Sequence, residues 1–218
     1  MSRHVHCLFI YPHFLFPSQS DFVCVNAFFS LAKLPNHLRP YMDAYVDAFF
    51  SLPIVRHNGM RLTYEDVVNQ LDNDTVEYGV ELGVSGFFEE KLRVSIEVEV
   101  AAYETAIAWL RDLIYGSEFD KERCAFLLIC QGVSDIKIKS SIQVVLAKLQ
   151  QVIPEWKRCG SDVLYSLWSD LIYAENSTPR FGHVLQQADI IPELIQRLQE
   201  SPEDVLADFE SIRQHGAV

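Results

Sequence analysis

The side chains best suited to binding a metal ion are seven histidines, and their spacing matches no helical metal motif. The motifs HExxH and HxxEH place two imidazoles on one helical face with a carboxylate base between them, and neither occurs. The single close pair is His4-x-His6, and a lone HxH pair does not define a zinc site. We therefore expect no metal ligand and no bound cofactor in this chain. The histidines are His4, His6, His13, His37, His57, His183 and His215.

Motifs for nucleophilic catalysis and phosphate binding are absent as well. No GxSxG elbow occurs, and no cysteine lies in a recognisable helix-start motif. The three glycines of YGVELGVSG lie in a strand pattern, which favours close packing or curvature over a phosphate loop. The carboxylates Asp72, Asp74, Glu77 and Glu81 allow two interpretations, an acid–base cluster or a solvated strand edge beside a helix end. We favour the second and expect no catalytic residue.

The composition is that of a soluble globular protein without nucleic-acid or membrane partners. Of the 218 residues, 49% are hydrophobic and 22% are charged, which argues against disorder. Thirty acidic residues against 18 basic ones give a formal net charge of −12, which repels nucleic acid and anionic membranes. No charge-free apolar span reaches the roughly 18 residues that a transmembrane helix requires.

The cysteines and the N-terminus argue for a reducing compartment and against secretion, and the expected location is cytoplasmic or mitochondrial. Five cysteines without a CxxC pair fit a reducing compartment and small buried side chains better than a disulfide framework. The N-terminal run MSRHVHCLFIYPHFLFPS begins with one arginine, as a signal peptide can. Pro12 and His13 interrupt its apolar stretch, and no small-x-small cleavage site follows.

The strongest helical pattern covers residues 38–52. Asn36 is a candidate N-cap, Pro40 suits a first turn, and Arg39 is expected on the polar side of the helix. Thr63, with Asp66 three residues later, predicts a capping box at the start of a second helix. The apolar face of the first helix has the spacing i, i+3, i+4, i+7 and consists of Leu38, Tyr41, Met42, Tyr45, Val46, Phe49 and Phe50.

Three segments alternate apolar and polar residues and predict strands that each have one buried face. They are residues 21–31, 75–84 and 91–100. The last two are separated by about six residues, so they should pair directly and bring acidic residues opposite Lys91 and Arg93. From residue 101 onward the pattern is helical, with helices expected near 101–116, 141–153, 161–173, 190–198 and 201–215. This order predicts an α+β fold, an antiparallel sheet with helices packed on one face.

Four large aromatic residues lie at helical spacings, and we expect them to pack in the core. They are Phe49, Phe50, Trp109 and Trp168. For the helix at 101–116 the expected inward face is Tyr103, Ile107, Leu110 and Ile114, with Gly116 ending the helix.

Four segments, taken in order, resemble a known family. They are VNAFFSLAKLPNHLRPYMDAYVDAFF, LTYEDVVNQL, DTVEYGVELGVS and KLRVSIEVEV. Together they resemble the third domain of presequence-protease-like zinc metallopeptidases, in the superfamily of pitrilysin and insulin-degrading enzyme. The resemblance covers roughly residues 20–123 and 141–215 and implies a domain that shapes the peptide-degrading chamber. In that family zinc and the catalytic glutamate belong to an HxxEH helix of the first domain, so no site residue carries over to this chain.

The resemblance divides the chain into an unmatched segment, residues 1–19, and one α+β domain, residues 20–218, with an atypical insert at 124–140. The family pattern continues into a closing strand that lies beyond IRQHGAV. A truncated product or an incorrectly delimited gene is therefore expected. The implied partners are the other domains of the parent peptidase and, for the parent, an unfolded peptide substrate.

Two other functions stay open at this point. One is a stand-alone interaction module or a silent subunit of the same superfamily, which a reproducible protein partner would support. The other is an enzyme with an unrecognised site, which metal-dependent peptidase activity of the pure chain would support. An HxxEH motif upstream in the same message would support the domain interpretation.

Overall fold

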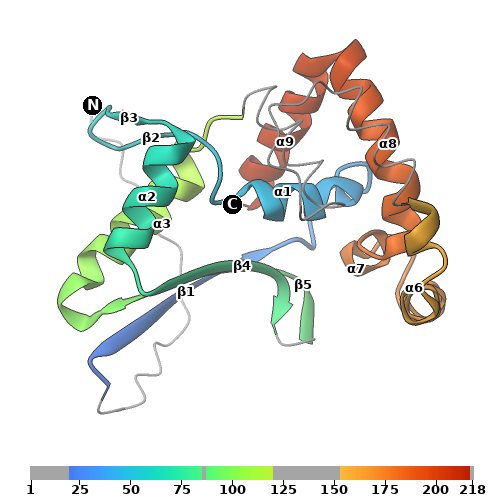
Figure 1. The fold of residues 1–218 in the computed structure, drawn as a ribbon, viewed down its shortest axis with the longest axis horizontal. Coiled ribbons are helices and arrows are strands. Elements are labelled where there is room, and N and C mark those ends of the chain that lie inside the picture. Colours follow the sequence, from blue (N-terminus) through green and yellow to red (C-terminus); the bar gives the residue numbers. More distant parts are fainter. Residues whose placement is uncertain (1–19, 85–86, 120–152, 217–218) are drawn as a thin grey trace.

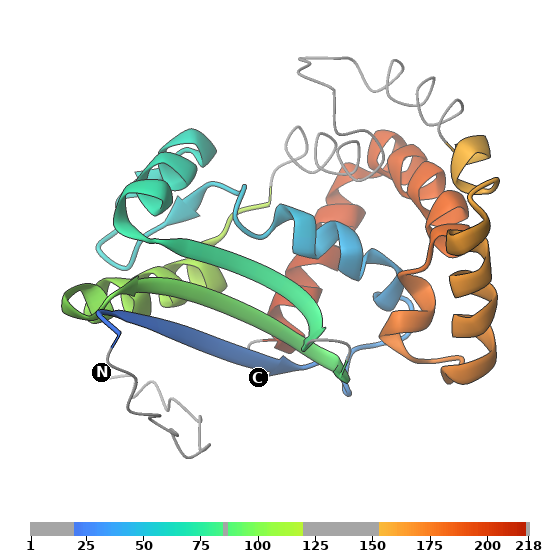
Figure 2. The same cartoon turned by 60° about the horizontal axis from the view of Figure 1, so that its bottom comes forward.

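The structure is a computed structural model that describes residues 20–84, 87–119 and 153–216 (Figure 1). Its fold is α+β, a small antiparallel sheet with helices, as the sequence pattern predicts. Helices α1, α2 and α3 lie along one side of the sheet, and the C-terminal helices α6 to α9 gather beyond one of its ends (Figures 1 and 2). The segments expected at 1–19 and 124–140 and nearly all of the helix expected at 141–153 lie outside the described residues.

The sheet contains β1 (Phe22–Ser30), β4 (Glu77–Val84) and β5 (Phe87–Glu99), in the order β1-β5-β4. All neighbours are antiparallel, with Val25 opposite Ile96 and Val80 opposite Val94. The three predicted strands and the direct pairing of the last two are confirmed. Because alternate side chains point to opposite faces, the apolar positions of all three strands share the face that the helices cover.

The other face of the sheet is polar at its centre. Glu81 on β4 lies opposite Arg93 on β5, and their side chains form the expected ion pair, 2.8 Å long. Toward the C-terminal end of β4, its pairing with β5 shifts in register between Leu82 and Val84, where Gly83 has a φ of +80°. Only glycine adopts this backbone without strain. Gly79 and Gly83 both lie within β4, as expected, whereas Gly86 lies outside the described residues.

The helix predicted over residues 38–52 is shorter and divided. It begins with a 3-10 turn, η1 (Arg39–Tyr41), and continues as α1 (Met42–Ala48). The capping role expected for Asn36 is wrong, because Leu38 occupies the N-cap position and no side chain caps it. The apolar face is confirmed, since Leu38, Met42 and Phe49 are all at least 96% buried.

A short hairpin follows, formed by β2 (Ile54–Val55) and β3 (Arg61–Leu62). Gly59, with a φ of +82°, supplies the turn expected at Asn58-Gly59. Helix α2 (Tyr64–Asp74) then begins with the predicted capping box. The Thr63 hydroxyl accepts from the Asp66 amide, and the Asp66 carboxylate accepts from the Thr63 amide.

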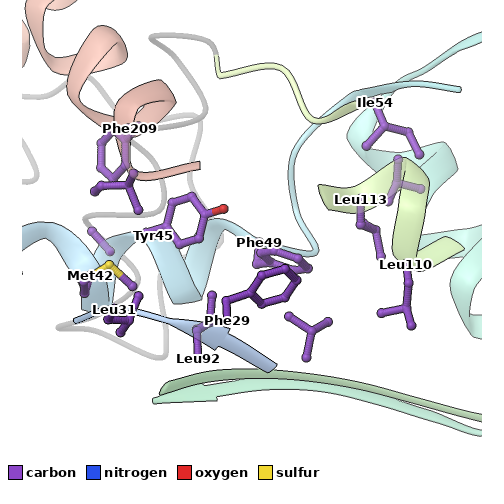
Figure 3. Packing of buried hydrophobic residues seen from close by; sticks show 14 of the residues in the cluster. Phe29, Leu31, Met42, Tyr45, Phe49, Ile54, Leu92, Leu110, Leu113 and Phe209 are labelled. Carbon is purple, nitrogen blue, oxygen red and sulfur yellow. The ribbon is translucent and has the colours of Figure 1, made fainter. Parts of the chain in front are cut away.

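The core lies between the sheet and the helices that cover it (Figure 3). Phe49 points toward Phe29 of β1 and packs edge-on against Tyr45 and Phe50, with ring centroids 6.1 and 5.1 Å apart. Tyr45 is buried, and this burial raises the pKa of its hydroxyl. The expected packing role is therefore confirmed for Phe49 and Phe50.

Helix α3 (Tyr103–Gly116) follows a 3-10 turn, η2 (Val100–Ala102), and packs against β1 and β5. Its expected inward face is wrong in part, because Tyr103 and Ile107 are exposed. The buried face is rotated by about one residue and consists of Ala106, Trp109, Leu110 and Leu113. Gly116 does end the helix, but for a steric reason, since a Cβ there would overlap the carbonyl oxygen of Val55.

The described C-terminal part is helical. It comprises α6 (Gly160–Ile172), α7 (Thr178–Phe181), α8 (Val184–Glu200) and α9 (Pro202–Gly216). Helix α8 is longer than predicted and contains Pro192 at its middle. Helix α9 matches the prediction, with Val205, Phe209 and Ile212 buried against the core.

Candidate interaction surface on helix α6

Helix α6 turns large apolar side chains away from the protein. Six of them are between 47% and 84% exposed. In Figure 2, α6 (orange) lies at the right edge of the molecule, at the end away from α2 and α3, and no described element lies outside it. We call this set the α6 apolar face, and it consists of Leu164, Tyr165, Leu167, Trp168, Leu171 and Ile172.

The side of α6 that meets the protein carries small polar residues. Ser166 and Ser169 are fully buried where α6 packs on α8. The Ser166 hydroxyl donates to the carbonyl oxygen of Asp162, 2.7 Å away, one turn earlier. The Ser169 hydroxyl has no partner among the described atoms. An amphipathic helix normally buries its apolar side, so α6 has the reverse orientation.

The apolar face is large enough to matter for binding. Six such side chains, half to four-fifths exposed, present on the order of 600 Å² of accessible surface, equal to the largest patch on a typical monomer. One side of a standard protein interface buries about 800 Å². Trp168 lies at the centre of an aromatic group, with Tyr165 at 6.0 Å and Tyr173 at 5.8 Å between ring centroids. The packing role expected for Trp168 inside this chain is wrong, whereas Trp109 is buried as expected.

Polar contacts at the C-terminal end of α6 fix its position. One oxygen of Asp170 accepts from Nε of Arg180, at 3.1 Å, and lies 3.2 Å from Nε2 of His183. His183 is the N-cap of α8, and its Nδ1 accepts from the Gln186 amide. Asp170 therefore joins α6 to α7 and α8 at once.

A second buried cluster joins α7 to the sheet. Arg39 is only 5% exposed, and its guanidinium donates to Glu90 of β5, at 2.6 Å, and to the Thr178 hydroxyl, at 2.7 Å. It also donates to the carbonyl oxygen of Leu31, at 3.2 Å. Glu90 in turn accepts from the Thr178 amide. The polar, outward position expected for Arg39 is wrong, because this contact across the fold buries it.

The pair formed by Asp170 and His183 is not arranged for catalysis. A general base needs one ring nitrogen directed at a nucleophile while the other is oriented by a carboxylate. In this chain Nδ1 accepts from Gln186, so Nε2 carries the proton and faces Asp170. Both ring nitrogens are engaged, and the imidazole is 2% exposed. The arrangement positions helices.

The four carboxylates considered as an acid–base cluster are held apart by separate contacts. Asp72 accepts from the Tyr78 hydroxyl, and Asp74 accepts from the Trp109 indole, at 2.8 and 2.9 Å. Burial, and secondarily the contact with Asp72, raises the pKa of Tyr78. Glu81 pairs with Arg93. Glu77 is exposed and lies opposite Glu97. The interpretation as a solvated strand edge beside a helix end is the one this geometry supports.

The remaining candidates contribute no site in the described part of the chain. His4 and His6 lie outside the described residues. Within residues 20–84, 87–119 and 153–216, no group of three or more histidine, cysteine or carboxylate side chains is placed to hold a metal ion. Cys24 and Cys159 are free thiols, and both are exposed, so the buried position expected for cysteines is wrong for these two. None of the described helices is both long and apolar enough to cross a bilayer.

The sequence predicts helix α6, as residues 161–173, but places Trp168 in the core and so misses the direction of its apolar side. Apolar side chains at helical spacing predict one apolar side, and a core position is the usual reason for it. The signal that could have reversed the assignment is the pair of serines, Ser166 and Ser169, on the opposite side, where an ordinary surface helix carries charges.

Comparisons with known proteins give relatives but no family, since no family model matches the chain. An uncharacterized protein of Schizosaccharomyces pombe is 26% identical over 212 residues, which is 91% of this chain and 19% of that protein. One of Saccharomyces cerevisiae is 22% identical, over 91% of this chain and 18% of its own length. An uncharacterized protein of Caenorhabditis elegans is 22% identical, over 87% of this chain and 17% of its own length. The chain thus spans less than a fifth of the length of these relatives.

Proposed function

We propose that this chain is a non-catalytic domain of a longer protein that resembles the presequence-protease-like zinc metallopeptidases. In this proposal it belongs to the part that encloses an unfolded peptide, and zinc and the catalytic base lie in another domain. The observation that carries the proposal is the reversed orientation of α6. Its apolar face has the size of one side of an interface. Asp170 joins α6 to α7 and α8, and Arg39 joins α7 to the sheet.

The occupant of the α6 apolar face in this proposal is another domain of the same longer polypeptide. The relatives are more than five times as long as the matched region, so a domain of this size has neighbours within its own chain. Faces between domains of one chain resemble protein interfaces and bury apolar side chains of this kind. A separate protein subunit on the same face, the stand-alone interaction module, is the alternative outcome of the test.

The first test is the message that encodes the chain. Sequencing the complete transcript should reveal a longer reading frame with an HxxEH motif upstream of these residues. That motif provides two histidines and a base on one helix, which a zinc peptidase requires. A complete message without it would contradict the peptidase resemblance.

The second test compares Leu171→Asp in the 218-residue chain and in the longer product. Leu171 is 84% exposed, so the substitution should leave the melting temperature of the 218-residue chain unchanged. In the longer product it should lower the melting temperature and increase cleavage by trypsin, because a charge would be buried between domains. Val76→Asp, at a residue that is 57% exposed and far from α6, is the matched control. If Leu171→Asp and Val76→Asp changed the melting temperature and the trypsin cleavage of the longer product equally, α6 would be ruled out as the docking face.

A further inference from the structure

The two edges of the sheet differ in how they are protected. β4 forms one edge and contains an irregularity, a glycine with positive φ, and two glutamates, Glu77 and Glu81. β1 forms the other edge over nine residues, FVCVNAFFS, with no charge, no proline and no irregularity in its register. Natural sheets block exposed edges with these devices, because bare edges pair with other strands. Only the β4 edge has them.

The hydrogen bonds at the two ends of β1 identify the main-chain groups that point outward. The Leu31 amide donates to Glu90, and the Val100 amide donates to Asp21, so the odd-numbered residues of β1 form the hydrogen-bonded pairs with β5. The N–H and C=O groups of the even-numbered residues therefore point away from β5.

Within the described residues no strand pairs with this outer edge of β1. At its start, the Phe22 amide is satisfied by the Ser20 hydroxyl, 3.2 Å away. The side chains of Cys24, Asn26 and Phe28 are exposed. Among the described residues, no strand therefore pairs with six outward main-chain groups, the N–H and C=O of these three residues.

We propose that the outer edge of β1 pairs antiparallel with β1 of a second copy of this chain. A two-fold axis at Asn26 places Asn26 opposite Asn26 of the other copy and Cys24 opposite Phe28. The outward groups of one strand then meet the outward groups of the other in a register without a gap. The result is one continuous six-stranded sheet.

The second copy fits this edge for a reason of charge. Each chain carries a formal net charge of −12, which opposes association in general. The segment Phe22–Ser30 carries none of that charge, so two β1 edges meet without like charges opposite each other. The β4 edge would bring its glutamates opposite those of the other copy. This proposal does not use the α6 apolar face, and it concerns the 218-residue chain itself rather than the longer product of the proposed function.

The first test measures self-association of the full 218-residue chain by sedimentation. The wild-type chain should show a concentration-dependent dimer between about 5 and 200 µM. Asn26→Lys places two lysines opposite each other at the axis and should weaken the dimer by at least about tenfold. Asn69→Lys, the same change at an exposed position of α2, is the matched control and should dimerise as the wild type does.

The second test reads the register by disulfide formation, in a chain whose five cysteines are changed to serine. Opposed residues of a hydrogen-bonded antiparallel pair have Cα atoms about 5.5 Å apart, within the range of a disulfide. Asn26→Cys in this background should give a covalent dimer under mild oxidation. A chain that retains only Cys24 should cross-link at least about tenfold more slowly, because its thiols lie four residues apart in register.

Two results would overturn the proposal. One is a wild-type chain that remains a monomer over the whole concentration range. The other is a dimer that Asn26→Lys leaves intact and that Leu171→Asp on α6 removes, since the contact would then lie on the α6 apolar face. A dimer lost in Asn26→Lys, kept in Leu171→Asp and cross-linked at position 26 supports the pairing of β1 edges.

Discussion

Nη1 of Arg39 lies 2.6 Å from Oε2 of Glu90, and this contact joins the 3-10 turn before α1 to the first part of β5. The arginine is buried, whereas the glutamate is 35% exposed. Because Thr178 of α7 bonds to both side chains, the same contact holds the C-terminal helices against the sheet. Helix α6, with its apolar face, packs on α7 and α8.

The first prediction is that Arg39→Ala destabilises the protein strongly. The substitution leaves the partly exposed Glu90 and the buried Thr178 hydroxyl without their donor, which should cost about 1–3 kcal/mol of unfolding free energy. Urea denaturation of the two chains gives the difference. Arg93→Ala removes the partly exposed pair with Glu81 and serves as the control, with an expected cost of about 0–1 kcal/mol. Equal costs for the two substitutions would mean that Arg39 does not join the parts of the fold.

The second prediction concerns Gly116 at the end of α3. A Cβ at this position would overlap the backbone carbonyl of Val55, which is held in the β2-β3 hairpin and by a bridge from Ile54 to Ser117. Gly116→Ala should therefore lower the unfolding free energy by about 1–3 kcal/mol, because backbone must move to accommodate the methyl group. Thermal unfolding measures the effect.

The control for Gly116 is Gly160, in the first turn of α6. A Cβ there meets nothing within 4 Å. Gly160→Ala should be neutral or stabilise the protein by up to about 1 kcal/mol, because alanine reduces the conformational entropy of the unfolded chain. A melting temperature that is equally unaffected in both variants would show that the end of α3 is not in contact with β2.

The third prediction concerns Asp43 on α1. Burial, and secondarily the charge of Asp47, raises the pKa of the Asp43 carboxyl from an ordinary value of 3.8 to about 7. The carboxyl lies against α7, since a Cβ on Gly182 would be 3.2 Å from its Oδ2. Between pH 4 and 7 the folded chain therefore holds a proton at this position that the unfolded chain has lost.

The sign of the pH effect follows from this difference in bound protons. Stability contributed by protonated Asp43 is present below pH 4 and is lost as the pH rises through 7. Asp43→Asn should raise the unfolding free energy at pH 8 by on the order of 1–3 kcal/mol and have little effect at pH 4. Asp47→Asn should give a smaller effect with the same sign. Parallel stability curves of wild type and Asp43→Asn from pH 4 to 8 would contradict the raised pKa.

The sequence predicts the elements of this fold better than their faces. Strict alternation identifies β1, β4 and β5, and the capping box of Thr63 and Asp66 marks the start of α2, because these signals are local. The two-residue strands β2 and β3 are too short to give a pattern.

The faces depend on what lies opposite each element. In α3 the core contacts Ala106 and Trp109 rather than Ile107, a rotation that periodicity alone does not determine. Arg39 is buried because Glu90 and Thr178, far away in the sequence, provide its partners. For the same reason the helical pattern of α6 alone does not give the side that faces solvent, and only Ser166 and Ser169 on the other side point to it. A helical pattern specifies which residues share a side, whereas the tertiary structure decides whether that side meets the core.

The last prediction is that the purified chain binds no stoichiometric zinc and cleaves no unstructured peptide. Hydrolysis by a zinc peptidase requires a metal held by three protein ligands, an open position for water and a general base. In the described part of the chain, both nitrogens of the buried His183 are engaged, and no three potential ligands come together. Metal content by mass spectrometry and turnover of a fluorogenic peptide, with and without added zinc, are the measurements.

The double variant His4→Ala and His6→Ala tests whether zinc bound by the HxH pair has any part in peptide cleavage. If the chain copurifies with substoichiometric zinc, this variant should remove it without any change in peptide turnover, because two adjacent ligands provide neither a third ligand nor a base. Chelator-sensitive peptide cleavage that persists in the double variant would refute the non-catalytic interpretation. The site would then have to include residues that carry no recognisable motif, and the α6 apolar face would have to be reconsidered as part of an enzyme.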